Sequence, residues 1–224
     1  MSYEQPYKGI KVVDLSQGIA GPYCGMLLAQ YGADVIKVEP FEGDWSRILG
    51  VTYGDHSAFS VAGNLGKRSV ALDLKTDEGR EIVNRLIDEA DVFMEGFRPG
   101  VIQRLGFSYE EVARRNPGIL YLSISGFSQK GPFATKPAMD PVLQAFTGFM
   151  MENKGQDGIP HRAAPIIVDM STALYSFQAV SAALYAKRDE EKGRFIDASL
   201  MAAASNLQIV RMMAVYLEKG EMKA

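Results

Sequence analysis

The sequence predicts an α/β fold, a Rossmann-like and mainly parallel sheet flanked by helices. Short β-branched segments alternate with segments whose apolar residues recur at helical spacing, which is typical of strands joined by covering helices. The segment 9–40, GIKVVDLSQGIAGPYCGMLLAQYGADVIKVEP, contains a strand, a loop, a helix and a second strand. In such parallel units ligands bind beyond the carboxyl ends of the strands, so the loop after Asp14 is predicted to face a ligand.

The limits of this first unit follow from its residues. Residues 10–14 alternate and are β-branched, as in a buried strand. Pro22 stands in the first helical turn, where its missing N–H is not needed, and Gly32 ends the helix. Residues 34–39 form the second strand.

The alternation continues along the rest of the chain. Further strands are predicted over 69–74, 91–95, 119–125 and 195–198. Further helices are predicted over 76–90, 99–106, 108–116, 138–151, 170–187 and about 199–218. The segment 40–66 has no clear periodicity and is predicted to be a long irregular connection, a kind of loop that is more often functional than idle.

Composition narrows the class of protein. The net charge of -3 over 224 residues gives no basic excess, so nucleic acid is a poor partner. Cys24 is the one cysteine, which excludes an internal disulfide framework, fits the cytoplasm and predicts a small core side chain. The N-terminus carries no apolar run, and no segment has the roughly 18 apolar residues of a membrane span. We expect a soluble cytoplasmic protein.

Several common sites are absent from the sequence. Gly18, Gly21 and Gly25 have the spacing GxxGxxxG, whereas a dinucleotide fingerprint needs GxGxxG. The chain has no P-loop, no HExxH motif and no paired cysteines, and His56 and His161 share no ligand spacing. We therefore expect no tightly bound nicotinamide or flavin cofactor and no metal site.

A set of cations follows strand ends or their neighbouring turns: Lys67, Arg68, Lys75, Arg98 and Arg104. If those ends share one edge of the sheet, the cations converge on an anionic ligand; otherwise they are scattered, solvated charges. The tripeptide Gly96-Phe97-Arg98 favours the first interpretation. It combines close backbone approach, a ring for stacking and a guanidinium for phosphate, which suits a nucleotide-like ligand.

Asp169 is the candidate catalytic residue. It follows an apolar stretch and directly precedes the helix predicted over 170–187, so it is expected to act as an N-cap. A helix N-terminus also keeps a carboxylate ionised and available as a nucleophile, and the two roles are compatible. Asp140 could be a similar cap, whereas Asp14 and Asp34 are predicted to be structural.

Five blocks in order resemble the class III CoA-transferase family, which includes formyl-CoA transferase and carnitine CoA-transferase. The blocks are KVVDLSQGIAGPYCGMLLAQYGADVIKVE, NLGKRSVALDLKTDEGRE, ADVFMEGFRPGVIQRLGF, NPGILYLSISGFSQKGP and VDMSTALY. The resemblance implies a large α/β domain, a smaller domain and a homodimer of interlinked chains. Because family chains are longer, we expect a CoA-binding large domain over 1–198 and, over 199–224, a helix that leads toward a missing linker and small domain.

The resemblance also implies an activity. Asp169 falls on the family's nucleophile, which attacks an acyl-CoA thioester to give an aspartyl-acyl anhydride that exchanges with a carboxylic-acid acceptor. CoA is then a substrate rather than a bound cofactor. The same carry-over assigns contacts with CoA to Ile19, Ala20, Leu72, Lys75, Gly96, Phe97, Arg98, Arg104, Lys136 and Met139.

Two departures from the family pattern affect the site, and two other functions stay open. Gly96 stands where many relatives have Asn, and Met139 stands where formyl-CoA transferase has an aromatic residue. One alternative is an acyl-CoA racemase of the same fold, but its histidine base would fall on Met139. The other is a CoA-binding fragment that is inactive without the C-terminal part.

Overall fold

A six-stranded parallel sheet forms the centre of the molecule. The structure is a computed structural model that describes residues 5–190 and 192–218. The strand order is β5-β2-β1-β6-β7-β8, and every pairing is parallel. The strands are β1 (Lys11–Asp14), β2 (Asp34–Glu39), β5 (Arg68–Ala71), β6 (Val92–Glu95), β7 (Leu120–Ser125) and β8 (Arg194–Ser199). The α/β fold and all six predicted strands are confirmed.

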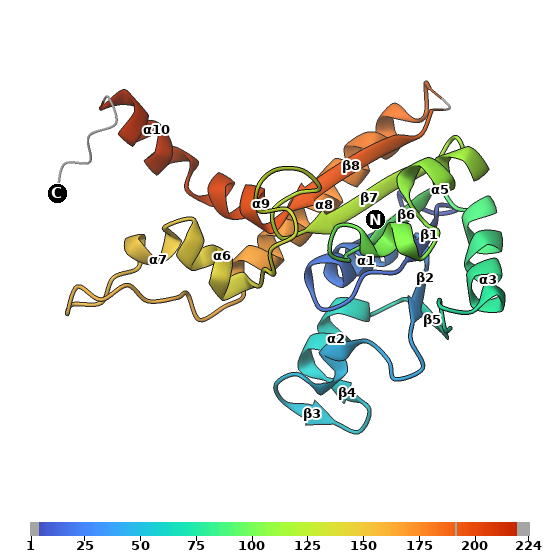
Figure 1. Ribbon diagram of the computed structural model, residues 1–224, viewed down its shortest axis with the longest axis horizontal. Coiled ribbons are helices and arrows are strands. Elements are labelled where there is room, and N and C mark those ends of the chain that lie inside the picture. The colour runs from blue at the N-terminus through green and yellow to red at the C-terminus, as the bar shows by residue number, and fades with distance from the viewer. Residues whose placement is uncertain (1–4, 191, 219–224) are drawn as a thin grey trace.

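Helices cover both faces of the sheet (Figure 1). One face packs against α1 (Ala20–Gln30) and α8 (Ile167–Ala186), and the other against α3 (Asp77–Asp88) and α5 (Tyr109–Arg115). Because side chains alternate along a strand, Val12 belongs to the first core and Val13 to the second. Cys24 is fully buried in the first core, as predicted, and burial raises the pKa of its thiol.

The segment 40–66 is more ordered than predicted. It contains a 3-10 helix η1 (Trp45–Ile48), a hairpin of β3 (Thr52–Tyr53) and β4 (His56–Ser57), and α2 (Ala58–Asn64). These elements are too short for hydrophobic periodicity and are defined by side-chain caps instead. Asp44 accepts from the backbone N–H of Ser46, and Ser57 and Ser60 form a capping box.

Two helices predicted as continuous are broken. The segment 138–151 divides into α6 (Asp140–Phe146) and α7 (Phe149–Glu152), because Gly148 between them has φ +80°. The last helix divides into α9 (Leu200–Leu207) and α10 (Ile209–Leu217), which bend by 65°. The short helix predicted over 99–106 is α4 (Val101–Arg104). The C-terminal segment expected to lead toward a second domain spans 199–224, and its residues 219–224 lie outside the described residues.

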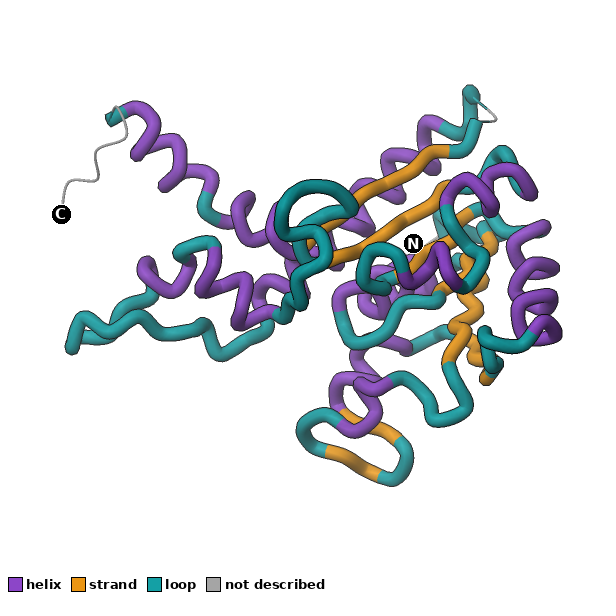
Figure 2. Tube along the Cα trace, viewed as in Figure 1, coloured by secondary structure: helices purple, strands orange, loops and turns teal. Residues whose placement is uncertain are grey.

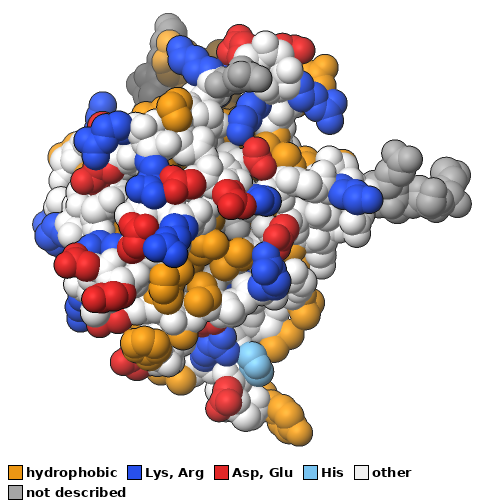
Figure 3. Space-filling view, turned by 90° about the vertical axis from the view of Figure 1, so that its right-hand side faces the viewer, with side chains coloured by type: hydrophobic (Ala, Val, Ile, Leu, Met, Phe, Trp, Pro, Cys, Tyr) orange, Lys and Arg blue, Asp and Glu red, His pale blue; other side chains and the backbone are white. Residues whose placement is uncertain are grey.

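The elements α6, α7 and α10 extend to one side of the sheet, away from α3 (Figure 1). Two long loops, between β7 and α6 and between α7 and α8, flank the α6–α7 pair (Figure 2). Among the described residues no single helix is long and apolar enough to cross a membrane, whereas the bent pair α9–α10 meets that test by length and composition. On the face in Figure 3, basic and acidic side chains are interspersed.

Candidate active site

A cavity of about 450 Å³ brings together most of the predicted site residues. Its wall comes from loops that follow β1, β6 and β7 and from the first turn of α8, and it includes Trp45. The predicted residues that line it are Ile19, Ala20, Gly96, Phe97, Arg98, Lys136, Met139 and Asp169. The cavity therefore lies at the carboxyl edge of the sheet, where parallel folds bind ligands.

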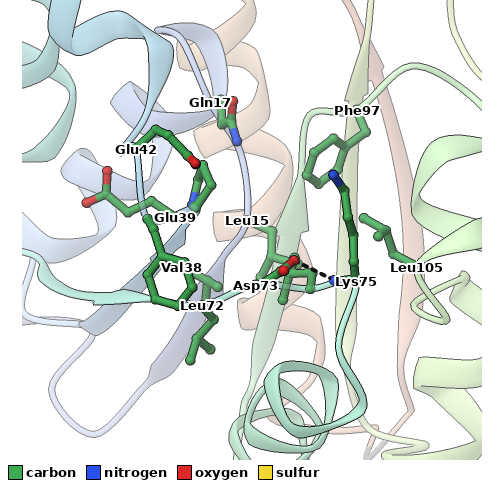
Figure 4. A pocket seen from close by; sticks show the side chains of 13 residues that line it. Leu15, Gln17, Val38, Glu39, Glu42, Leu72, Asp73, Lys75, Phe97 and Leu105 are labelled. Carbon is green, nitrogen blue, oxygen red and sulfur yellow. Dashed lines mark hydrogen bonds between the residues drawn. The ribbon is translucent and has the colours of Figure 1, made fainter.

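A second cavity of about 270 Å³ adjoins the first, since Gln17 and Phe97 line both. It contains two further predicted residues, Leu72 and Lys75. Figure 4 shows the Lys75 side chain pointing toward the Phe97 ring, while its backbone N–H donates to Asp73 at 2.9 Å. The two cavities are therefore adjacent, with Gln17 and Phe97 between them. Arg104 lines neither of them, although its neighbour Leu105 lines the second.

The cation set divides into two groups, so the predicted convergence is wrong for Lys67 and Arg68. Lys67 is buried and pairs with Asp14 at 2.8 Å. Arg68 lies at the amino end of β5 and pairs with Asp34 at the amino end of the neighbouring strand β2, away from the carboxyl edge. Within the described residues no acidic side chain pairs with the cations that line the cavities, which are Lys75, Arg98 and Lys136. The site therefore has free positive charge beside Phe97.

Asp169 lies inside the first turn of α8 rather than before it. The helix begins at Ile167 and its N-cap is Ile166, whose own side chain makes no capping hydrogen bond, so the expected N-cap role of Asp169 is wrong. The carboxyl group is partly buried in the wall of the larger cavity. Burial, and then the charge of Asp140, raise the pKa of Asp169 to about 7.

Asp140 caps α8 from another helix. It is the first residue of α6, and its Oδ2 accepts the backbone N–H of Val168 at 2.7 Å and that of Asp169 at 3.0 Å. Its Oδ1 accepts from Gln144, whose own oxygen accepts the N–H of Ala163 at 2.7 Å. These contacts hold the chain before Asp169 and satisfy the free N–H groups of the helix end.

Three site residues have no strong sequence signal. Gln17 joins the two cavities, and Trp45 covers Gly18, where an added Cβ would lie 2.5 Å from the indole. Glu95 is fully buried beneath Phe97, whose N–H it accepts at 2.8 Å, and burial raises the pKa of Glu95 to about 7. A tryptophan in the aperiodic segment 40–66 is the one signal that could have indicated this wall.

The described residues contain no group of three or more His, Cys, Asp or Glu side chains placed to hold a metal ion. The arrangement instead offers a carboxyl group at a helix N-terminus, unpaired cations and an aromatic ring around two adjacent cavities. These groups can bind a phosphate-bearing ligand and present one carboxylate to it.

Curated relatives are CoA-transferases. The chain is 41% identical over 197 residues to the acetyl-CoA:oxalate CoA-transferase of Acetobacter aceti, with 87% of this chain and 51% of that protein covered. It is 36% identical to the human succinyl-CoA:glutarate CoA-transferase, with 91% and 47% covered. The chain thus spans about half the length of the curated relatives that it matches.

Solved structures agree with this likeness. A CAIB/BAIF family protein from Brucella suis superposes with a TM-score of 0.92 at 38% identity, with 97% of this chain and 59% of that chain covered. The Mycobacterium tuberculosis protein Rv3272 gives a TM-score of 0.87 at 31% identity, with 95% and 58% covered. The family model described as CoA-transferase family III matches residues 7–224. With the match extending over nearly all of its length, the chain belongs to CoA-transferase family III.

Proposed function

We propose that this chain belongs to an enzyme that transfers CoA between an acyl-CoA thioester and a free carboxylic acid, with Asp169 as the nucleophile. The observation that carries the proposal is that Asp169 lines the same cavity as Phe97 and Arg98. The relatives of the chain, which include acetyl-CoA:oxalate and succinyl-CoA:glutarate CoA-transferases, support the reaction class.

In the proposed first step, an ionised Asp169 oxygen attacks the thioester carbonyl carbon. The carbon–sulfur bond breaks, CoA leaves as a thiolate, and an aspartyl-acyl anhydride forms. An oxygen of the acceptor carboxylate then attacks the aspartyl carbonyl carbon of the anhydride, and the bond to the donor acid breaks, so that the donor leaves as a carboxylate. The CoA thiolate attacks the acyl carbonyl carbon of the new anhydride, which forms the product thioester and releases the Asp169 carboxylate. Because burial raises the pKa of Asp169 to about 7, the reactive carboxylate becomes more populated as the pH rises through neutrality.

We assign the CoA phosphates to the unpaired cations that line the two adjacent cavities. Lys75 lines the smaller cavity, and Arg98 and Lys136 line the larger one, where guanidinium and ammonium groups can bind phosphate oxygens. Phe97 lies between them and offers a ring face to the ligand. Arg104 stays a candidate for the outer phosphate. CoA is a substrate in this scheme, and we propose no tightly bound cofactor.

We further propose that the chain is the large domain of a longer, cytoplasmic homodimeric enzyme. Residues 1–198 form the CoA-binding domain, and the helix that follows leads toward a second, smaller domain. In support, α10 has no buried residue, and Val210, Tyr216 and Leu217 are 81%, 77% and 79% exposed. Apolar surface of this kind marks an interface with another domain or chain.

The racemase alternative is less well supported. It needs a basic side chain close to Asp140, and Met139 occupies that position on the cavity wall. Neither His56 nor His161 lines either cavity. The remaining alternative is a CoA-binding fragment without turnover, and the following experiment distinguishes it from a transferase.

Trapping the acyl-enzyme tests the proposed function. The protein is incubated with a panel of acyl-CoA thioesters and hydroxylamine, digested, and analysed by mass spectrometry for a hydroxamate on Asp169. We expect label on wild type and on Asp157→Ala, an exposed control acid, and none on Asp169→Ala. Absence of label in folded protein that binds CoA would support the inert fragment, and α-deuterium exchange without an acceptor acid would support the racemase.

A further inference from the structure

Charged side chains without access to solvent hold the loop between β1 and α1. The backbone N–H of Ser16 donates to Asp14 Oδ1 at 2.9 Å, and the Ser16 carbonyl accepts from Lys37 Nζ at 2.7 Å. The N–H of Gly18 donates to Asp44 Oδ1 at 3.0 Å. Three backbone polar groups of this short loop, the N–H and carbonyl of Ser16 and the N–H of Gly18, are therefore held by charged side chains rather than by secondary structure.

The four charges form two buried ion pairs. Lys37 Nζ lies 2.8 Å from Asp44 Oδ2, and these side chains are 2% and 1% exposed. Lys67 Nζ lies 2.8 Å from Asp14 Oδ2, with 2% and 0% exposed. Desolvation makes buried ion pairs weak contributors to stability, and hydrophobic residues of similar volume often replace them without loss. Their presence therefore points to a role other than stability.

The loop held by these pairs is part of the candidate active site. Gln17 lines both cavities, and Ile19, at its end, lines the larger one. Asp44 also places Trp45, which packs over Gly18 and lines the larger cavity. On the other side, Lys67 Nζ donates to the Pro22 carbonyl at 2.7 Å in the first turn of α1. The Lys37–Asp44 pair thus holds the Ser16 carbonyl and the Gly18 N–H, whereas the Lys67–Asp14 pair holds the Ser16 N–H and the first turn of α1.

We propose that Lys37 and Asp44 are positioning residues, whose ion pair holds the Ser16–Gly18 loop in the conformation that accepts CoA; this rests on the proposed function. Neither residue lines the larger cavity, so neither is assigned a contact with the ligand there. They act through their hydrogen bonds to the Ser16 carbonyl and the Gly18 N–H, and through the position of the Trp45 ring over Gly18. The pair thus fixes the positions of two backbone groups of the loop, the Ser16 carbonyl and the Gly18 N–H.

The double variant Lys37→Met/Asp44→Asn separates positioning from stability. It removes both charges at nearly constant volume, and the asparagine oxygen can still accept from Gly18 and Ser46. The matched control is Lys187→Met/Asp91→Asn, which removes a less buried pair, 3.1 Å apart, at the opposite edge of the sheet. Amide exchange of the peptide over residues 15–19, CoA affinity by calorimetry and Tm are measured for both.

We expect the double variant to keep its Tm within about 4 °C of wild type, while amide exchange over residues 15–19 becomes at least about tenfold faster. We also expect CoA to bind about tenfold more weakly, and the control to match wild type in exchange and affinity. Unchanged exchange in the folded double variant overturns the proposal. If that variant does not fold, Asp44→Asn alone is judged by the same exchange criterion. Wild type that binds no CoA would overturn the assignment of CoA binding to residues 1–198, while the exchange measurement, made without ligand, would still decide the role of the pair.

Discussion

The Asp140 carboxylate accepts the backbone N–H of Asp169 at 3.0 Å, so the proposed nucleophile is held by a second acid from another helix. The same oxygen accepts the N–H of Val168 at 2.7 Å. The contact orders the first turn of α8 and places a negative charge next to the reactive carboxyl group. Geometry and charge therefore act in opposite directions on Asp169: the first positions it, and the second favours its protonated form.

Replacing Asp140 by Asn is expected to move the pH dependence of acyl transfer. The Asp140 charge, after burial, raises the pKa of Asp169, so its removal lowers that pKa. The Asn oxygen still accepts both N–H groups. The midpoint of hydroxamate labelling on Asp169 then shifts from about pH 7 to a pH lower by about one unit. The distant variant Asp157→Asn serves as control, and an unchanged midpoint in Asp140→Asn would contradict the electrostatic role.

Asp169→Asn is expected to stabilise the protein more at pH 8 than at pH 5. The pKa of Asp169 is about 7 in the folded protein, above its ordinary value, so folded-state stability falls as pH rises toward 7. Asparagine removes this ionisation. After a discount for partial exposure, we expect the gain in unfolding free energy to be about 1–2 kcal/mol larger at pH 8 than at pH 5. Urea titrations of wild type and variant at both pH values measure it; an equal gain at both would refute the assignment.

Gly18→Ala is expected to disturb the cavity wall as well as the backbone. Gly18 has φ +84°, and its added Cβ would lie 2.5 Å from the Trp45 ring. Gly148 has φ +80° with no atom within 4 Å, so Gly148→Ala measures backbone strain alone. We expect losses of about 1 kcal/mol for Gly148→Ala and about 2–3 kcal/mol for Gly18→Ala.

Trp45 reports on the same pair of variants, because it is the one tryptophan of the chain. Its emission is expected to shift to longer wavelength and its quenching by acrylamide to increase in Gly18→Ala, as the ring leaves the loop. Both signals stay at the wild-type values in Gly148→Ala. Equal stability losses with unchanged emission in both variants would show that the added Cβ at position 18 does not displace the Trp45 ring, and would contradict the prediction.

Most of the sheet could be predicted from the sequence because its strands are regular and buried. The strands predicted over 91–95 and 119–125 contain the apolar runs 92–94 and 119–122, and β6 and β7 lie within two residues of the predicted limits. The segment 40–66 could not be predicted, because η1, the β3–β4 hairpin and α2 are held by caps and turns that leave no period.

The site was predicted in part, for a physical reason that differs between residues. Asp169 and Phe97 follow local signals and meet in the cavity as expected. Lys67 lies before the amino end of the strand predicted over 69–74. Its ion pair with Asp14 appears only in the tertiary structure. The Asp140 contact with α8 joins residues 28 and 29 positions apart, a separation at which sequence pattern carries no information.

Truncating the substrate tests which cations bind the nucleotide end of CoA. Lys75 and Arg98 have no acidic partner among the described residues, and each lines one of the two adjoining cavities. If they bind the CoA phosphates, Lys75→Ala and Arg98→Ala should each lower the efficiency of Asp169 labelling by acyl-CoA about 10- to 100-fold. The same substitutions should leave labelling by the matching acyl-pantetheine, which has no phosphate, unchanged within about twofold.

The control is Arg85→Ala. Arg85 is exposed on α3 and forms an ion pair with Glu81, so this variant should match wild type with both thioesters. Increasing salt should weaken acyl-CoA labelling of wild type more steeply than that of Lys75→Ala or Arg98→Ala, because each variant has one cation fewer for the ligand. A variant that loses acyl-CoA and acyl-pantetheine labelling equally would place its cation near the reacting carbonyl rather than at the phosphates. Such a result would reverse the direction in which CoA is laid along the two cavities.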